Sequence, residues 1–185
     1  MSPPLPSHRS PSARSRHDPG AQPLAPVLRH LLAYWEAKRG ARAMPARRDL
    51  DPTEIPRLLP YLLLTDVLPD GGYRYRLVGT EVERSFGASM TGKRIDELMF
   101  GDYLAYMSGL YRRVVETRQP LFSGSRYGGV HGQSPLFTER LMLPLSSDGE
   151  TVDMVLSAQV FRGAGPLDDR TASALQHLAD HDRDS

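Results

Sequence analysis

The sequence contains no cysteine among its 185 residues. A disulfide framework and a thiolate metal site are therefore both excluded, and so is covalent attachment of a chromophore through a cysteine sulfur. The absence of cysteine fits a reducing compartment, so we expect a cytoplasmic protein.

Long hydrophobic runs are also missing. The longest strongly apolar stretch, Ile55 to Val67, is interrupted by prolines and charged residues and is far shorter than the ~20 residues that cross a bilayer. Residues 1–26 carry positive charge but lack the apolar core of about 7–15 residues that a secretory signal requires. We therefore predict no association with a membrane, and we interpret residues 1–22 as a disordered tail.

The chain has little net charge. It has 23 Lys and Arg against 22 Asp and Glu, a formal charge of +1, which supplies no overall attraction for nucleic acid. Arg9, Arg14 and Arg16 lie in the Pro/Ser-rich tail, where such residues are usually solvated. A role as a transcriptional regulator acting through this tail is therefore the least favoured of the functions considered.

Apolar residues at steps of three and four predict a helix from Pro26 to Arg39, with Gly40 at its C-terminal end. A helix this short needs a surface to cover, either a sheet or a second subunit. Its apolar stripe is larger than a peripheral helix needs, which is typical of an interface. We therefore predict a homodimer. The predicted interface residues are Leu24, Leu28, Leu31 and Trp35.

The rest of the chain predicts short strands and helices. Pro69 to Gly72 is a strong turn signal between two alternating runs, which indicates a β-hairpin. Thr80 and Glu83 fit a capping box, and Asp102 fits the N-cap of a longer helix that ends near Gln119. The predicted strands are Leu62–Val67, Tyr73–Val78, Leu121–Tyr127, Phe137–Leu145 and Val152–Phe161; the predicted helices after the first are Thr80–Phe86, Ile95–Met99, the helix from Asp102, and one near Asp168–Leu178.

A charged turn, MPARRDLDP, lies between Met44 and Pro52. Its aspartates, Asp49 and Asp51, are suited to capping the segment that follows, and Arg47 or Arg48 could bridge to them. We favour this structural role over a partner-binding edge.

Three segments resemble a known family. They are WEAKRGARAMPARRDLDPTEIPRLLPYLLLTD from Trp35, YRYRLVGTEVERSFGASMTGKRIDEL from Tyr73, and ERLMLPLSSDGETVDMVLSAQVF from Glu139. Together they resemble the stand-alone PAS-domain proteins of alphaproteobacteria, a PAS_5-like group formerly described as a domain of unknown function. The resemblance covers about Leu28 to Arg162.

The resemblance implies an α+β fold. Five antiparallel strands would form a sheet in the order 2-1-5-4-3, with helices on one face enclosing a cavity and with flanking N- and C-terminal helices. The PAS-like domain would span residues 23–162, followed by a linker and helix over residues 163–185. Within it, we place the ligand cavity between the long helix and the inner face of the sheet. The predicted ligand-binding residues are Tyr106, Leu110, Arg126, Tyr127, Ser157 and Gln159.

The resemblance implies a sensory or signalling module that binds a small molecule or a separate signalling protein. A rival interpretation is a protein-interaction adaptor whose cavity is filled by its own side chains. We expect no enzyme, because no G-x-S-x-G motif or phosphate-binding loop occurs. We also predict no metal site and no tightly held haem, because His131 is the only histidine within the strand region. The sequence does not identify a cofactor or ligand.

Overall fold

The computed structural model describes residues 25–127 and 136–162. Residues 1–24, the loop 128–135 with His131, and residues 163–185 with the predicted C-terminal helix lie outside this description. None of the described helices is long and apolar enough to span a membrane. The elements are α1 (Pro26–Arg39), η1 (Arg47–Asp49), η2 (Pro52–Glu54), η3 (Leu59–Tyr61), β1 (Leu62–Val67), β2 (Tyr73–Val78), α2 (Thr80–Phe86), α3 (Ile95–Leu98), α4 (Gly101–Thr117), β3 (Leu121–Tyr127), β4 (Leu136–Leu145) and β5 (Met154–Arg162).

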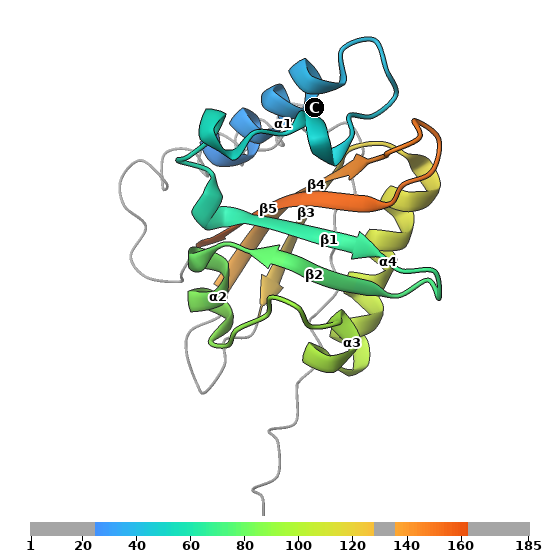
Figure 1. Cartoon of the computed structure of the whole chain (residues 1–185). Coiled ribbons are helices and arrows are strands. Elements are labelled where there is room, and N and C mark those ends of the chain that lie inside the picture. Colours follow the sequence, from blue (N-terminus) through green and yellow to red (C-terminus); the bar gives the residue numbers. More distant parts are fainter. Residues whose placement is uncertain (1–24, 128–135, 163–185) are drawn as a thin grey trace, which may run out of the picture.

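The five strands form one antiparallel sheet in the order β2-β1-β5-β4-β3 (Figure 1). This is the order that the resemblance implied. A register shift between Leu64 and Thr65 interrupts the pairing of β1 with β2. Strand β5, the last in the chain, pairs with β1, the first, at the centre of the sheet.

The sheet is covered on both faces. On the inner face, the Tyr111 hydroxyl of α4 lies 3.0 Å from the Thr65 hydroxyl of β1. On the outer face, Trp35 of α1 donates from Nε1 to the backbone oxygen of Pro144 at 2.9 Å. Figure 1 shows α1 and α4 on different sides of the strands. Both alternating sets of residues on the central strands are therefore buried, as expected for a sheet between two layers.

The α1 stripe packs within its own chain. Leu28 and Leu31 are fully buried and Trp35 is 2% exposed. Because these three side chains already fill the core on the outer face, they have no surface left for a partner, and the predicted interface is wrong for them. Leu24, the fourth predicted interface residue, lies outside the described residues. The homodimer itself stays a prediction.

The charged turn has the structural role that we favoured. Asp51 caps η2 by accepting from the Thr53 backbone nitrogen at 2.9 Å, and Asp49 accepts from the Ala46 nitrogen at 2.8 Å. The arginine that pairs with Asp49 is Arg42, at 2.8 Å, rather than either predicted arginine. These donors lower the pKa of Asp49, the Ala46 amide first and Arg42 second.

Two predicted helix caps are wrong. Helix α2 follows Gly79, not Thr80, and its Glu83 carboxylate accepts instead from the Met90 backbone nitrogen at 2.8 Å. Helix α4 follows Phe100 and begins before Asp102. In both cases the N-cap position lies before the predicted capping residue.

Candidate functional site

Three polar residues form a row across the inner face of the sheet. Ser123 in β3 lies opposite Arg140 in β4, and Arg140 lies opposite Gln159 in β5. Their exposed fractions are 1%, 2% and 8%. Residues two apart in a strand share a face, so Thr138 and Ser157 belong to the same buried surface. The centre of the inner face is thus polar although it lies beneath α4.

Arg140 is the centre of this row. Its Nε donates to Oε1 of Gln159 at 3.0 Å, whereas Nη1 and Nη2 have no hydrogen-bond partner of good geometry; the uncharged Tyr103 phenol lies close to the guanidinium. Arginine stays protonated in proteins, so the guanidinium is a buried cation. A buried charge without a counter-charge is strongly unfavourable. The described residues therefore supply no counter-charge for this guanidinium.

Hydroxyl groups without partners gather in the same layer. Most buried polar atoms in proteins have a hydrogen-bond partner, so several unpartnered ones in one place require an explanation. These atoms come from three strands and from α4, and they are all buried. They are Oγ of Ser123, Oγ1 of Thr138, Oγ of Ser157 and the hydroxyl of Tyr106. We define these residues, with Arg140 and Gln159, as the inner polar layer.

Tyrosines border the inner polar layer. Burial raises the pKa of Tyr103 and of Tyr111. The nearby Arg140 guanidinium opposes the rise in Tyr103, whereas in Tyr111 the hydrogen bonds with Thr65 and Tyr75 oppose it more than Arg140 does. The ring of Tyr111 stacks on Tyr73, with ring centroids 4.7 Å apart. The border of the layer is therefore aromatic and uncharged near neutral pH.

The structure brings four of the six predicted ligand-binding residues to this region. Ser157 and Gln159 share the inner face, the Tyr106 hydroxyl is buried without a partner, and Leu110 is 2% exposed in the core. Arg126 and Tyr127 lie in β3, and their side chains are outside the described part of the structure.

Sequence reasoning missed Arg140. In β4 it alternates with Glu139, Leu141 and Leu143, a mostly apolar set that lies on the opposite face of the sheet. The available signal was the mixture of Met142 and Pro144 with Arg140, which is unusual for a fully solvated face.

The family comparison decides the identity of the fold. A family model described as PAS_5, PAS domain, matches residues 25–159. The chain belongs to this family of PAS domains. The resemblance inferred from the sequence is thereby confirmed, while the alphaproteobacterial source stays a prediction.

Solved structures similar to this PAS domain are light-oxygen-voltage domains. One, studied with a flavin analogue, has a TM-score of 0.49 and 12% identity, with 72% of this chain and 94% of that chain covered. The light-oxygen-voltage protein of Rhodobacter sphaeroides has a TM-score of 0.47 and 18% identity, with coverages of 68% and 74%. An RNA-binding light-oxygen-voltage receptor has a TM-score of 0.48 and 16% identity, with coverages of 93% and 44%. No curated protein matches the chain significantly.

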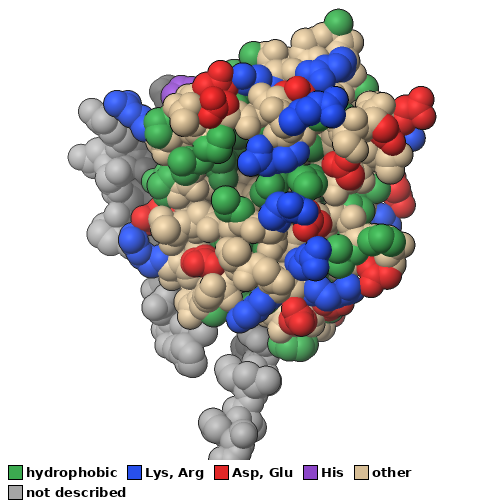
Figure 2. Space-filling view, in the orientation of Figure 1, with side chains coloured by type: hydrophobic (Ala, Val, Ile, Leu, Met, Phe, Trp, Pro, Cys, Tyr) green, Lys and Arg blue, Asp and Glu red, His purple; other side chains and the backbone are tan. Residues whose placement is uncertain are grey.

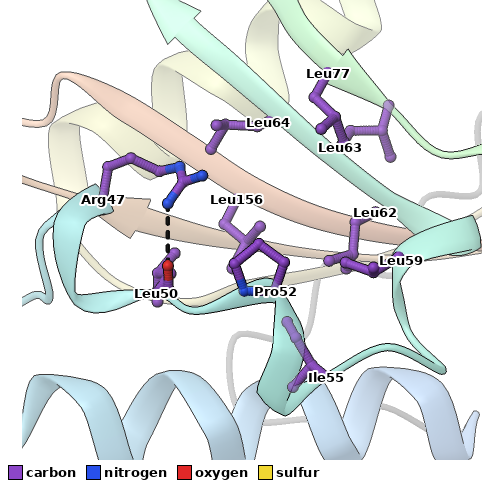
Figure 3. Close-up of a pocket in the computed structure, with 10 residues that line it drawn as sticks. All are labelled: Arg47, Leu50, Pro52, Ile55, Leu59, Leu62, Leu63, Leu64, Leu77 and Leu156. Carbon is purple, nitrogen blue, oxygen red and sulfur yellow. Dashed lines mark hydrogen bonds between the residues drawn. The ribbon is translucent and has the colours of Figure 1, made fainter.

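A separate apolar groove lies on the outer face of the PAS domain (Figure 3). It has a volume of about 60 Å³, well below the ~300–1,000 Å³ of typical ligand pockets. Its only charged lining residue, Arg47, donates from Nη1 to the backbone oxygen of Leu50 at 3.1 Å. In the same orientation as Figure 1, Figure 2 shows exposed hydrophobic side chains among Lys and Arg residues. The groove is lined by Arg47, Leu50, Pro52, Ile55, Leu59, Leu62, Leu63, Leu64, Leu77 and Leu156.

A larger hollow of about 320 Å³ lies between the β1–β2 turn, α3 and α4. Its Arg94 is already paired, through Nη1 with Asp70 at 2.8 Å and through Nε with Asp96 at 3.0 Å. The Arg94 guanidinium is thus already neutralised by two carboxylates at the surface of the hollow. Within the described ranges, no group of three or more His, Asp or Glu is placed to hold a metal ion. The inner polar layer, in which several buried polar atoms have no hydrogen-bond partner, is the better candidate site.

Proposed function

We propose that this PAS domain is a sensory module that binds a small molecule between α4 and the inner face of the sheet. The observation that carries this proposal is the inner polar layer, in which two guanidinium nitrogens of Arg140 and four hydroxyls are buried without partners. A bound molecule with polar groups would supply those partners. Ligand sites typically combine apolar and aromatic walls with a few convergent polar groups, as here.

The proposed signal is a shift of α4 against the sheet. Helix α4 packs on β3 and β4 over the layer, so a ligand that enters beside it would displace it. A ligand changes a conformational equilibrium only when it binds the two conformations unequally. The sheet is rigidly paired across five strands, so the helix is the element that would move, and a separate signalling protein in the cytoplasm would read its position. We propose no catalytic step.

The rival function, an adaptor with a self-filled core, is less well supported. A core that is filled by its own side chains satisfies its buried polar atoms or replaces them with apolar ones. The inner polar layer does neither. A transcriptional role through the basic tail would depend on residues 1–22, which lie outside the described residues.

Replacing Ser157 with leucine tests the location of the site. Ser157 is 2% exposed and its Oγ has no partner, so the larger side chain would occupy the space of a ligand. We expect Ser157→Leu to abolish retention of a small molecule, as detected by native mass spectrometry of the purified protein. The cost in unfolding free energy should be about 1–3 kcal/mol, as for other overpacked sites.

Ser157→Ala is the matched control, because it removes the hydroxyl without filling the space. It should retain the molecule with reduced affinity. Retention by a folded Ser157→Leu protein at the wild-type level would place the site elsewhere.

We further propose that the domain forms a homodimer through the outer face. Leu59 and Leu77 border the groove of Figure 3 and remain 37% and 47% exposed. Exposed apolar surface of this kind often marks an interface, and a two-fold pairing is its commonest use. Sedimentation velocity at tens of micromolar should show a dimer for the wild type and a monomer for Leu77→Glu. A monomeric wild-type protein would refute the proposal.

A further inference from the structure

We propose, building on the function proposed above, that the ligand of the inner polar layer is a small carboxylate with an apolar body. Its carboxylate oxygens would accept hydrogen bonds from Nη1 and Nη2 of Arg140.

The charge of Arg140 has no counterpart in the described protein. The buried carboxylates are engaged elsewhere: Asp66 pairs with Arg76 at 2.8 Å, and Glu139 accepts from the Ala25 backbone nitrogen at 3.1 Å beside α1. Residues adjacent in a strand point to opposite faces, so Glu139 lies across the sheet from Arg140. Within residues 25–127 and 136–162 no carboxylate remains for the layer, so we assign its negative charge to a ligand.

Deprotonated tyrosine does not supply this charge. Burial raises the pKa of the phenols of Tyr75, Tyr103 and Tyr111, so all three are neutral near pH 7. They can donate or accept hydrogen bonds but cannot neutralise the guanidinium.

The free edge of Arg140 has the shape of a carboxylate receptor. Gln159 holds Nε and so restrains the plane of the guanidinium, while Nη1 and Nη2 are left as a pair of donors. Such a pair binds the two oxygens of a carboxylate side by side.

The site favours a carboxylate over a phosphate. Arg140 is the one buried basic side chain in the described part of the chain, so it balances a single negative charge. It also lies within β4, paired on both sides by β3 and β5, where backbone N–H groups serve the sheet. The backbone nest that commonly holds a phosphate is therefore missing at this position.

The other groups of the layer describe the body of the ligand. Met107 and Leu110 of α4 are buried apolar neighbours in the core, and the rings of Tyr103 and Tyr106 pack together with centroids 6.4 Å apart. The hydroxyls of the layer could bind one or two further polar atoms. An aliphatic or aromatic acid fits this combination better than a highly charged metabolite.

The test compares acids with their amides, which have nearly the same shape but no charge. Full-length protein is titrated with benzoate, benzamide, hexanoate, hexanamide and inorganic phosphate, and binding is followed by thermal shift and calorimetry. We expect at least one acid to raise the melting temperature and to bind about tenfold or more tightly than its amide, because hydrogen bonds to charged groups are the stronger ones. In Arg140→Met this preference should disappear, and in Arg140→Lys it should be weakened but retained.

The outcomes separate this inference from the proposed function. Equal binding of acid and amide, or binding of the amide alone, would overturn the carboxylate while leaving the small-molecule site intact. Binding of phosphate alone would also overturn it. Failure of all five compounds to bind, with no molecule retained by the purified protein, would overturn both proposals. If Arg140→Met does not fold, the comparison of acid and amide in the wild type still decides.

A ligand-free measurement tests the same idea independently. If Arg140 is an uncompensated charge, then Arg140→Met combined with Gln159→Leu should melt at a higher temperature than the wild type without ligand. The double variant removes the charge and its one hydrogen-bond partner together. A lower melting temperature would mean that the protein itself compensates the guanidinium, and it would overturn the inference.

Discussion

Trp35→Ala is expected to lower the free energy of unfolding by about 3–5 kcal/mol, the usual cost of truncating a buried tryptophan. The indole is 2% exposed between α1 and the outer face of the sheet, and its Nε1 donates to the Pro144 oxygen at 2.9 Å. The substitution would leave a cavity and remove the partner of that carbonyl. Because Trp35 is the single tryptophan of the chain, unfolding should be followed by circular dichroism in urea rather than by fluorescence.

Glu36→Ala is the control for this experiment. Glu36 is the next residue of α1 and is exposed, so its replacement should change the unfolding free energy by no more than about 0.5 kcal/mol. Equal effects of the two substitutions would show that α1 does not pack on the sheet through Trp35.

Gly79→Ala is expected to destabilise the domain by about 3 kcal/mol or more, at the upper end of overpacking effects. A β-carbon at this position would meet the backbone carbonyl oxygens of Leu59 and Pro60 in η3. Backbone atoms cannot rotate away as a side chain can. Gly79 also donates from its nitrogen to the Leu62 oxygen at 2.7 Å, which holds the junction of β2 and α2 against the start of β1. The junction would therefore have to separate.

Gly109→Ala is the matched control in α4. No atom lies within 4 Å of a β-carbon built there, and alanine favours a helix over glycine by about 0.5–1 kcal/mol. This variant should therefore be slightly more stable than the wild type in the same urea titration. If Gly79→Ala were as stable as Gly109→Ala, the close approach of η3 to the β2–α2 junction would be refuted.

Local patterns predicted the elements of this domain well. Helix α1 has the predicted bounds, because Pro26 suits the first turn and Gly40 adopts a positive φ of 54° at the end. The hairpin of β1 and β2 also has its predicted strands, since its turn residues leave few alternatives. Such signals act over a few residues, so they can be recognised without knowledge of the fold.

The predicted interface was wrong because an apolar stripe on a helix indicates that the stripe will be buried. It does not indicate which surface will bury it. Leu28, Leu31 and Trp35 were correctly expected to be buried, yet the cover is the outer face of the chain's own sheet. The strands that provide it, β4 and β5, are more than a hundred residues away in the sequence, so nothing local to α1 indicates them.

The sequence by itself determined the absence of thiol chemistry, the order of the elements and the sets of residues that share a face of each strand. Only the tertiary structure decided what each face meets. In β4, period two separates Arg140 from Glu139, but it does not tell which set lies beneath α4. That choice depends on the pairing of β4 with β3 and β5 and on helices packed from both sides. This pairing and packing place Arg140 beside Gln159 and Ser123 in a buried layer. Burial depends on segments that are distant in the sequence, so a local pattern does not reveal it.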